Sequence, residues 1–131
     1  MDPQPLVSII IPNYNYGLFI GQAIDSALDQ TYPNVEVIVV DDGSTDDSVG
    51  TISAYQNRLQ FILKENGGQA SAVNAGFEAS HGDIVVILDA DDFLQPGAIS
   101  EVVKAFDNDK IVKVHWPLWR TDEEGNKTGK K

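Results

Sequence analysis

The chain alternates short apolar runs with segments whose apolar residues recur at helical spacing. The apolar runs are rich in Val and Ile and occupy residues 6–12, 35–40, 59–63, 83–88 and 111–116. Runs of this length and composition are typical of buried strands. Between them, apolar residues three and four positions apart predict helices; Pro33 follows the first helix and Pro96 begins the last.

This alternation predicts an α/β fold, in which a mostly parallel, twisted sheet carries helices on both faces. Ligands of such sheets bind beyond the carboxyl ends of the strands. No internal repeat, low-complexity stretch or linker divides the sequence, so residues 1–131 are expected to form a single domain. The polar end of the chain carries, at 124–126, the Glu-Gly-Asn signal of a hairpin connection.

Polar side chains gather where three of the predicted strands end. These clusters are residues 13–15, Asp41-Asp42 and 89–92, and they are expected to meet at one edge of the sheet. Asp89 and Asp91 are two positions apart, so both carboxylates would project to the same side if strand geometry continued, and they could share one divalent cation. An isolated D-x-D is more often a solvated acidic turn, and both interpretations stand at this point.

Two loops with glycine have both a structural and a functional interpretation. Gly43 and Ser44 follow Asp42, where Gly permits a positive φ and Ser44, with an acidic residue three positions later, predicts the start of a helix. An aspartate at such a strand end can also accept an N–H from a planar base. Gly67-Gly68, together with Asn74 and the glycine that follows it, could let the backbone approach a diphosphate, or could simply permit the turn.

Charge and composition narrow the function. The sequence has 20 acidic and 9 basic residues, a formal net charge of -11, which argues against binding nucleic acid or an anionic membrane. Before Asp92 the only basic residues are Arg58 and Lys64, so a phosphorylated ligand there would need a metal to neutralise it. The sequence has no Cys and hence no disulfide, and no apolar run approaches the ~20 residues of a membrane span, so we expect a soluble segment.

Four segments resemble one enzyme family, in the right order and over nearly the whole chain. They are VSIIIPNYN, QTYPNVEVIVVDDGSTD, NGGQASAVNAG and ILDADDFLQPG. Together they resemble the nucleotide-binding half of the GT-A-fold, inverting family-two glycosyltransferases. The resemblance implies transfer of a sugar from a nucleotide-diphosphate donor, usually a UDP-sugar, to an acceptor hydroxyl. The acceptor would be a glycan or a lipid-linked molecule.

The resemblance assigns roles to several residues. Pro12 and Tyr14 would border the base, and Asp42 would accept its N–H. Asp89 would lie near the ribose and the metal, and Asp91 would hold Mn²⁺ or Mg²⁺ bridging the two phosphates. The metal would stabilise the departing nucleoside diphosphate as a Lewis acid.

One position and one region depart from the family pattern. Asn74 counts among the nucleotide-binding positions, but Val73 stands where many members carry an arginine. In the family, the acceptor-binding half and the catalytic base lie beyond the region that this chain matches. We therefore expect 1–131 to be the donor-binding portion of a larger, cytoplasmic enzyme, at the membrane's cytoplasmic face if the parent protein is attached there. A dimer is left open.

Other functions are weighed against this one. A nucleotidyltransferase commonly has a basic, glycine-rich loop after its first strand, and the NYNYG segment has no basic residue. A phospho-receiver module needs an aspartate at the end of its third strand, where this chain has Lys64-Glu65. A nucleotide-binding but non-catalytic module remains the third alternative.

Overall fold

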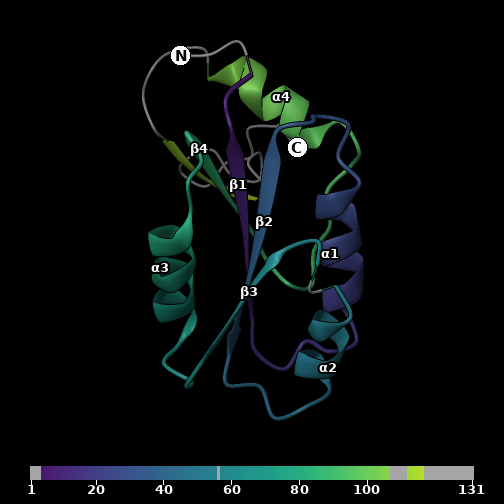
Figure 1. Cartoon of the computed structure of the whole chain (residues 1–131), viewed down its shortest axis with the longest axis vertical. Coiled ribbons are helices and arrows are strands. Elements are labelled where there is room, and N and C mark those ends of the chain that lie inside the picture. Colours follow the sequence, from purple (N-terminus) through teal and green to yellow (C-terminus); the bar gives the residue numbers. More distant parts are fainter. Residues whose placement is uncertain (1–3, 56, 107–111, 117–131) are drawn as a thin grey trace, which may run out of the picture.

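The computed structural model describes residues 4–55, 57–106 and 112–116, and they form alternating strands and helices (Figure 1). The strands are β1 (Val7–Asn13), β2 (Val35–Asp42), β3 (Gln60–Lys64), β4 (Ile84–Leu88) and β5 (Val112–Trp116). The helices are α1 (Ile20–Leu28), α2 (Ser48–Ser53), α3 (Gln69–Ala79) and α4 (Ala98–Ala105). Every predicted strand and helix within the described residues is therefore present, at bounds shifted by a few residues.

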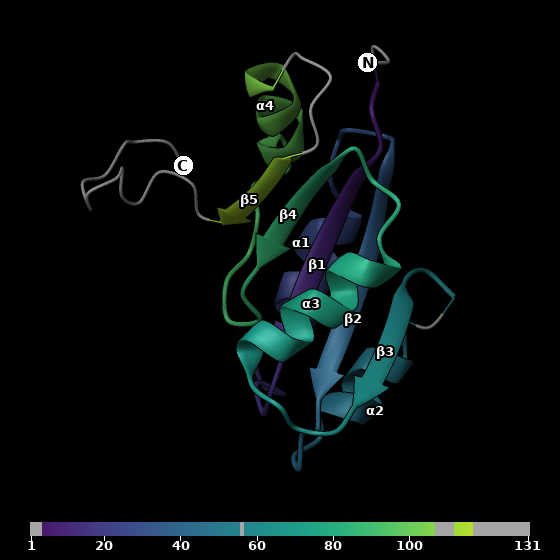
Figure 2. The ribbon, with the colours of Figure 1, turned by 90° about the vertical axis from the view of Figure 1, so that its left-hand side faces the viewer.

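The strands form one sheet in the order β3-β2-β1-β4-β5, and every described pair is parallel (Figure 2). The chain runs from β1 outward to β3 and then returns to the other side of β1 for β4. Loops after β1 and β4 therefore leave the same edge of the sheet in opposite directions, which opens a space for a ligand between them.

Helices cover both faces of this sheet, as predicted. Side chains of α1, α2 and α4 pack with the odd-numbered side of β1, including Ile9 and Ile11, in the larger core. On the opposite face α3 lies across β1 and β2 (Figure 2), where Ala72 packs with Ile10 and Val40. Among the described residues, no helix is long and apolar enough to cross a membrane.

Gly76 lets α3 approach the sheet closely. A Cβ at this position would lie 2.6 Å from Cγ2 of Ile10 and 3.2 Å from Cγ2 of Val40. A methyl group would have to displace both side chains from a closely packed layer. The glycine after Asn74 and Ala75 is thus explained by helix packing, without a phosphate.

The start of α2 differs from the sequence prediction. The helix begins at Ser48, not near Ser44, because the Ser44 hydroxyl is engaged elsewhere: it donates to Oδ1 of Asp41 at 2.7 Å and accepts the N–H of Asn15 at 2.9 Å. The Ser48 N–H instead donates to Oδ1 of Asp46 at 2.9 Å. The predicted positive φ of Gly43 is confirmed, at 80°. The predicted hairpin at 124–126 lies outside the described residues.

A partly buried hydrogen-bond cluster joins the amino ends of β1 and β2 to the segment between α3 and β4. Oε2 of Glu36 accepts the Ser8 hydroxyl at 2.5 Å and the His81 N–H at 2.6 Å, while the His81 ring lies 3.2 Å from Oε1. Burial opposes ionisation, but the hydrogen bonds from Ser8 and His81 outweigh it and hold the pKa of Glu36 below its usual range. This cluster lies at the end of the sheet opposite to the acidic strand ends.

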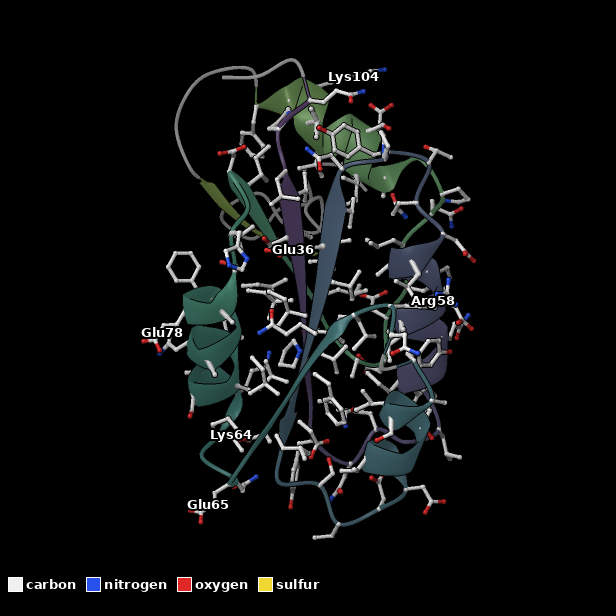
Figure 3. The ribbon with its side chains drawn as sticks, viewed as in Figure 1. Glu36, Arg58, Lys64, Glu65, Glu78 and Lys104 are labelled. Carbon is white, nitrogen blue, oxygen red and sulfur yellow. The ribbon has the colours of Figure 1, made fainter. Side chains whose placement is uncertain are left out.

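Replacing Glu36 with Gln is expected to lower the free energy of unfolding at pH 7 by roughly 1–3 kcal/mol, because a neutral amide accepts the hydrogen bonds from Ser8 and His81 more weakly than the carboxylate does. Since the folded-state pKa is lowered, the carboxylate's contribution is present above the unfolded value of ~4.3 and disappears as the pH falls through the folded value. Urea unfolding between pH 7 and pH 3 should therefore show a shallower decline for Glu36→Gln. The control is Glu78→Gln, at an exposed position of α3 (Figure 3); equal slopes in all three proteins would contradict the prediction.

Candidate functional site

A cavity of about 650 Å³ opens at the carboxyl ends of β1, β2 and β4. Its walls come from the end of β1 and the loop after it, the last residue of β2, the loop after β3, the first turn of α3 and the turn after β4. Among the lining residues are Pro12, Tyr14, Asp42, Asp89 and Asp91. Five side chains that the sequence marked separately thus share one cavity.

Asn74 does not belong to this group. It is exposed on α3 and is not among the lining residues, although Gln69 and Ala72 of the same helix are. Its role in nucleotide binding stays a prediction. A second cavity, of about 510 Å³, lies against α1 and the amino ends of β2 and β3, near Arg58, and contains none of the predicted site residues.

Asp41 fastens the loops after β1 and β2 together. Its carboxylate is almost fully buried and accepts hydrogen bonds from Nδ2 of Asn13 at 3.0 Å and from the N–H and hydroxyl of Ser44 at 2.9 and 2.7 Å. Asn15, at a φ of 58°, adds a bond from Thr45 N–H to its Oδ1 at 2.7 Å. Asp41 therefore holds the loops that form the site in place, whereas the side chain of the neighbouring Asp42 lines the cavity.

Two asparagines of the first loop were noted in the sequence without a role. Asn13 lines the cavity and is 1% exposed, and its Oδ1 is a buried acceptor without a hydrogen-bond partner among the described residues. Because Asn13 and Asn15 both anchor to the loop after β2, Tyr14 between them turns outward with 44% of its surface exposed. Tyr14 is therefore not a buried packing residue, and its ring is accessible from the cavity.

Asp42 is buried, with 3% of its surface exposed, and hydrogen-bond donors surround its carboxylate. Oδ1 accepts Nζ of Lys64 at 2.8 Å and the Gly67 N–H at 2.9 Å, while Oδ2 accepts the Gly68 N–H at 2.9 Å and Nδ2 of Asn66 at 3.3 Å. Burial opposes ionisation, but these donors, Lys64 first, outweigh it and hold the pKa of Asp42 below its usual range. Asp42 is thus a buried carboxylate that stays charged.

This arrangement revises the interpretation of the Gly67-Gly68 turn. The turn's N–H groups are directed at Asp42, so they serve a carboxylate of the chain itself and not an incoming diphosphate. Gly68 has a φ of 99°, a conformation that suits glycine and that places its N–H toward Oδ2. A negative diphosphate is therefore disfavoured at this wall, and base binding by Asp42 stays a prediction.

The opposite wall carries Asp89 and Asp91, in a different geometry from the one expected. β4 ends at Leu88, and the N–H of Asp92 donates to the carbonyl of Asp89 at 3.0 Å, so the segment is a turn and not a continued strand. The argument from strand alternation is wrong here. The turn nevertheless brings both aspartates to the cavity because the residue between them, Ala90, is buried under it.

The carboxylates of Asp89 and Asp91 fit a divalent cation that enters the cavity together with a diphosphate. Carboxylate oxygens suit Mg²⁺ and Mn²⁺, and Mg²⁺ is commonly held by one or two carboxylates plus substrate phosphates. In the described part of the chain, no three His, Asp or Glu residues come close enough together to hold a metal unaided. Asp89 and Asp91 could therefore complete the coordination of a metal that a diphosphate already carries.

Comparison with known proteins assigns the family. The profile of Glycosyl transferase family 2 matches residues 8–131. The chain belongs to this family. A Nostoc protein described as an uncharacterized glycosyltransferase is 41% identical over 112 residues, which are 82% of this chain and 35% of that protein. The chain thus spans about a third of the length of the first relatives that it matches.

Solved glycosyltransferases share the fold. A mannosyltransferase from Pyrobaculum calidifontis, in complex with GDP-mannose and Mn²⁺, superposes with a TM-score of 0.72 at 32% identity, covering 80% of this chain and 33% of that one. TarS from S. aureus, in complex with UDP-GlcNAc, gives a TM-score of 0.68 at 28% identity, covering 76% and 30%. The predicted GT-A-like α/β fold is therefore confirmed. Family-two membership also decides against the phospho-receiver and nucleotidyltransferase alternatives.

Proposed function

We propose that this chain binds a nucleotide-diphospho-sugar, with UDP as the nucleotide, and supplies the donor half of an inverting glycosyltransferase. The observation that carries the proposal is the single cavity that unites Tyr14, Asp42 and Asp91 from three different strand ends. Similar enzymes bind UDP-GlcNAc in one case and GDP-mannose with Mn²⁺ in another, which supports a nucleotide-sugar ligand.

The two walls of the cavity give the donor an orientation. The base lies at the wall where Tyr14 offers an exposed ring for stacking and Asp42 offers a charged acceptor for an N–H, with Pro12 at the edge. The diphosphate lies toward Asp89 and Asp91. In this orientation the phosphates avoid the negative charge of Asp42, and the ribose spans the distance between the walls.

A metal at the second wall would be held by Asp91, with Asp89 beside it. When bound, Mn²⁺ or Mg²⁺ supplies Lewis-acid stabilisation of the leaving diphosphate. The chain contributes carboxylate oxygens that fix the position of that charge, and the described residues that line the cavity include no Lys or Arg that could replace it. Inversion at the sugar requires a base on the face opposite the leaving group, and we assign this role to no residue of the chain.

A binding panel tests the proposal. Calorimetry of the chain with UDP, GDP, CDP and ADP, each with Mn²⁺ and with EDTA, should show the tightest binding for UDP with Mn²⁺. A preference for GDP would contradict uracil as the base but would still support a nucleotide-binding site. Absence of binding for all four nucleotides would overturn the proposed function.

A further inference from the structure

Lys64 does not line the cavity but contacts Asp42, which does. It is the last residue of β3 and pairs in register with Asp42, the last residue of β2. Its Nζ donates to Oδ1 of Asp42 at 2.8 Å and to the Glu65 carbonyl at 2.7 Å. Figure 3 shows Lys64 and Glu65 at the carboxyl end of β3. The side chains of Lys64 and Asp42 are 21% and 4% exposed, so water screens this ion pair only in part.

The donors around Asp42 divide into two groups according to the cavity. Lys64 and Gly67, which bind Oδ1, are not among the residues that line it, whereas Asn66 and Gly68, which bind Oδ2, both line it. The carboxylate is therefore held with Oδ1 directed away from the cavity and Oδ2 on the side of the cavity.

We infer that Lys64 is a positioning residue for recognition of the donor's base: by holding Oδ1 of Asp42, it keeps Oδ2 as the acceptor for an N–H of that base. The inference rests on the proposed function. It assigns specificity to a residue that the ligand does not touch, and it names the ligand class as a nucleobase that presents a ring N–H, as uracil does.

One of the bonds to Oδ2 can give way to the base. Nδ2 of Asn66 lies 3.3 Å from Oδ2 but only 3.0 Å from the main-chain oxygen of Asp42, so it keeps a partner when the first contact is lost. The bonds from Lys64 and Gly67 are shorter and lie on the far oxygen. An incoming N–H therefore displaces the Asn66 contact and leaves the Lys64 contact in place.

Loss of the ammonium would change the charge of Asp42. Among the described residues, the other charged or titratable groups around the site do not replace it: Tyr14, Tyr16, Asp89 and Asp91 line the cavity, and Glu65 follows Lys64. Asp41 is hydrogen-bonded to Asn13 of β1 and to Ser44. Without Lys64, burial favours the protonated acid, and the pKa of Asp42 rises. A protonated carboxyl is a poorer acceptor for the base.

The test compares Lys64→Met and Lys64→Arg with the wild type in calorimetric titrations of UDP with Mn²⁺ at pH 7 and at pH 4, the lower value being near the usual pKa of an aspartate. Lys64→Met should lose more affinity than the wild type on acidification, by up to about tenfold for each unit by which the pKa of Asp42 has risen, because its carboxyl becomes protonated at a higher pH. Lys64→Arg keeps the charge and should follow the wild type. Lys104→Met, at an exposed position of α4, controls for a lost positive charge. NMR of the ligand-free proteins should show a raised pKa for the Asp42 carboxyl in Lys64→Met only.

Each other outcome counts against the inference. A Lys64→Met protein that keeps the wild-type pH profile, or that binds UDP more weakly by the same factor at both pH values, reduces Lys64 to a structural residue and overturns it. If the Met variant does not fold, Lys64→Gln replaces it. This variant keeps a hydrogen-bond donor but no charge, and it should show the same additional loss of UDP affinity on acidification. A wild-type protein that binds no nucleotide overturns the proposed function and this inference together, and that result differs visibly from failure of the variants alone.

Discussion

Replacing Asp91 with Ala is expected to abolish the Mn²⁺-dependent part of UDP binding. Asp91 is exposed on the turn after β4 and lines the cavity at the wall assigned to the diphosphate. Because no three-ligand protein site exists there among the described residues, the loss of one carboxylate leaves a metal held mainly by phosphate oxygens. Mutation of residues that only hydrogen-bond to a metal ligand typically lowers metal affinity by about 10–100-fold. Loss of the ligand itself should therefore weaken metal-dependent binding by ~100-fold or more.

Calorimetry with Mn²⁺ and with EDTA measures this effect. Asp92→Ala is the matched control, because Asp92 is one position away, does not line the cavity and uses Oδ1 to accept the Phe93 N–H at 3.0 Å. The control should keep the wild-type difference between the two conditions. Equal UDP affinity of the wild type in Mn²⁺ and in EDTA would contradict the role of the metal, and an undiminished metal effect in Asp91→Ala would contradict the role of Asp91.

Replacing Asp42 with Asn is expected to damage both stability and base recognition. An amide at this position cannot balance the Lys64 ammonium, and its NH₂ group faces donors where the carboxylate had accepted their hydrogen bonds. Removing one partner of a buried ion pair costs about 3–5 kcal/mol, and the partial exposure of Lys64 places the expected loss near ~3 kcal/mol. UDP affinity should fall as well, since the charged acceptor for the base is gone.

Urea unfolding and calorimetry below the unfolding transition separate the two effects. Asp47→Asn serves as control because Asp47 is exposed at the start of α2 and makes no side-chain cap bond there. It should unfold and bind as the wild type does. If Asp42→Asn unfolds at a lower urea concentration but the folded protein binds UDP with unchanged affinity, Asp42 only stabilises the turn before α3 and does not recognise the base. Unchanged stability would show that the ion pair with Lys64 contributes nothing.

The sequence predicted the sheet because each strand is defined locally. Uninterrupted runs such as Ile9 to Ile11 can only be buried on both faces, and the alternation with helical segments requires parallel neighbours. The position of the site followed from the same logic, since parallel strands bring their carboxyl ends to one edge. This logic was enough to bring Tyr14, Asp42, Asp89 and Asp91 to one cavity, whereas Pro12 and the individual roles came from the family resemblance.

Details that depend on neighbouring strands were not predictable. The pairing of Asp42 with Lys64 follows from the register of β2 and β3, which no local pattern specifies. Ser44 carried a helix-start signal, but the buried Asp41 carboxylate competed for its hydroxyl. Asp89 and Asp91 reach the cavity through a turn, where strand alternation no longer applies. In each case a tertiary contact outweighed a local preference.

Crystals of this chain soaked with UDP and Mn²⁺ give the most direct test, through the anomalous density of the metal together with the density of the nucleotide. We predict a single Mn²⁺ peak beside Asp91, with the diphosphate next to it, the base stacked on Tyr14 and a base N–H directed at Oδ2 of Asp42. Nucleotide density elsewhere, for example in the second cavity near Arg58, or a metal peak remote from Asp91, would contradict the account.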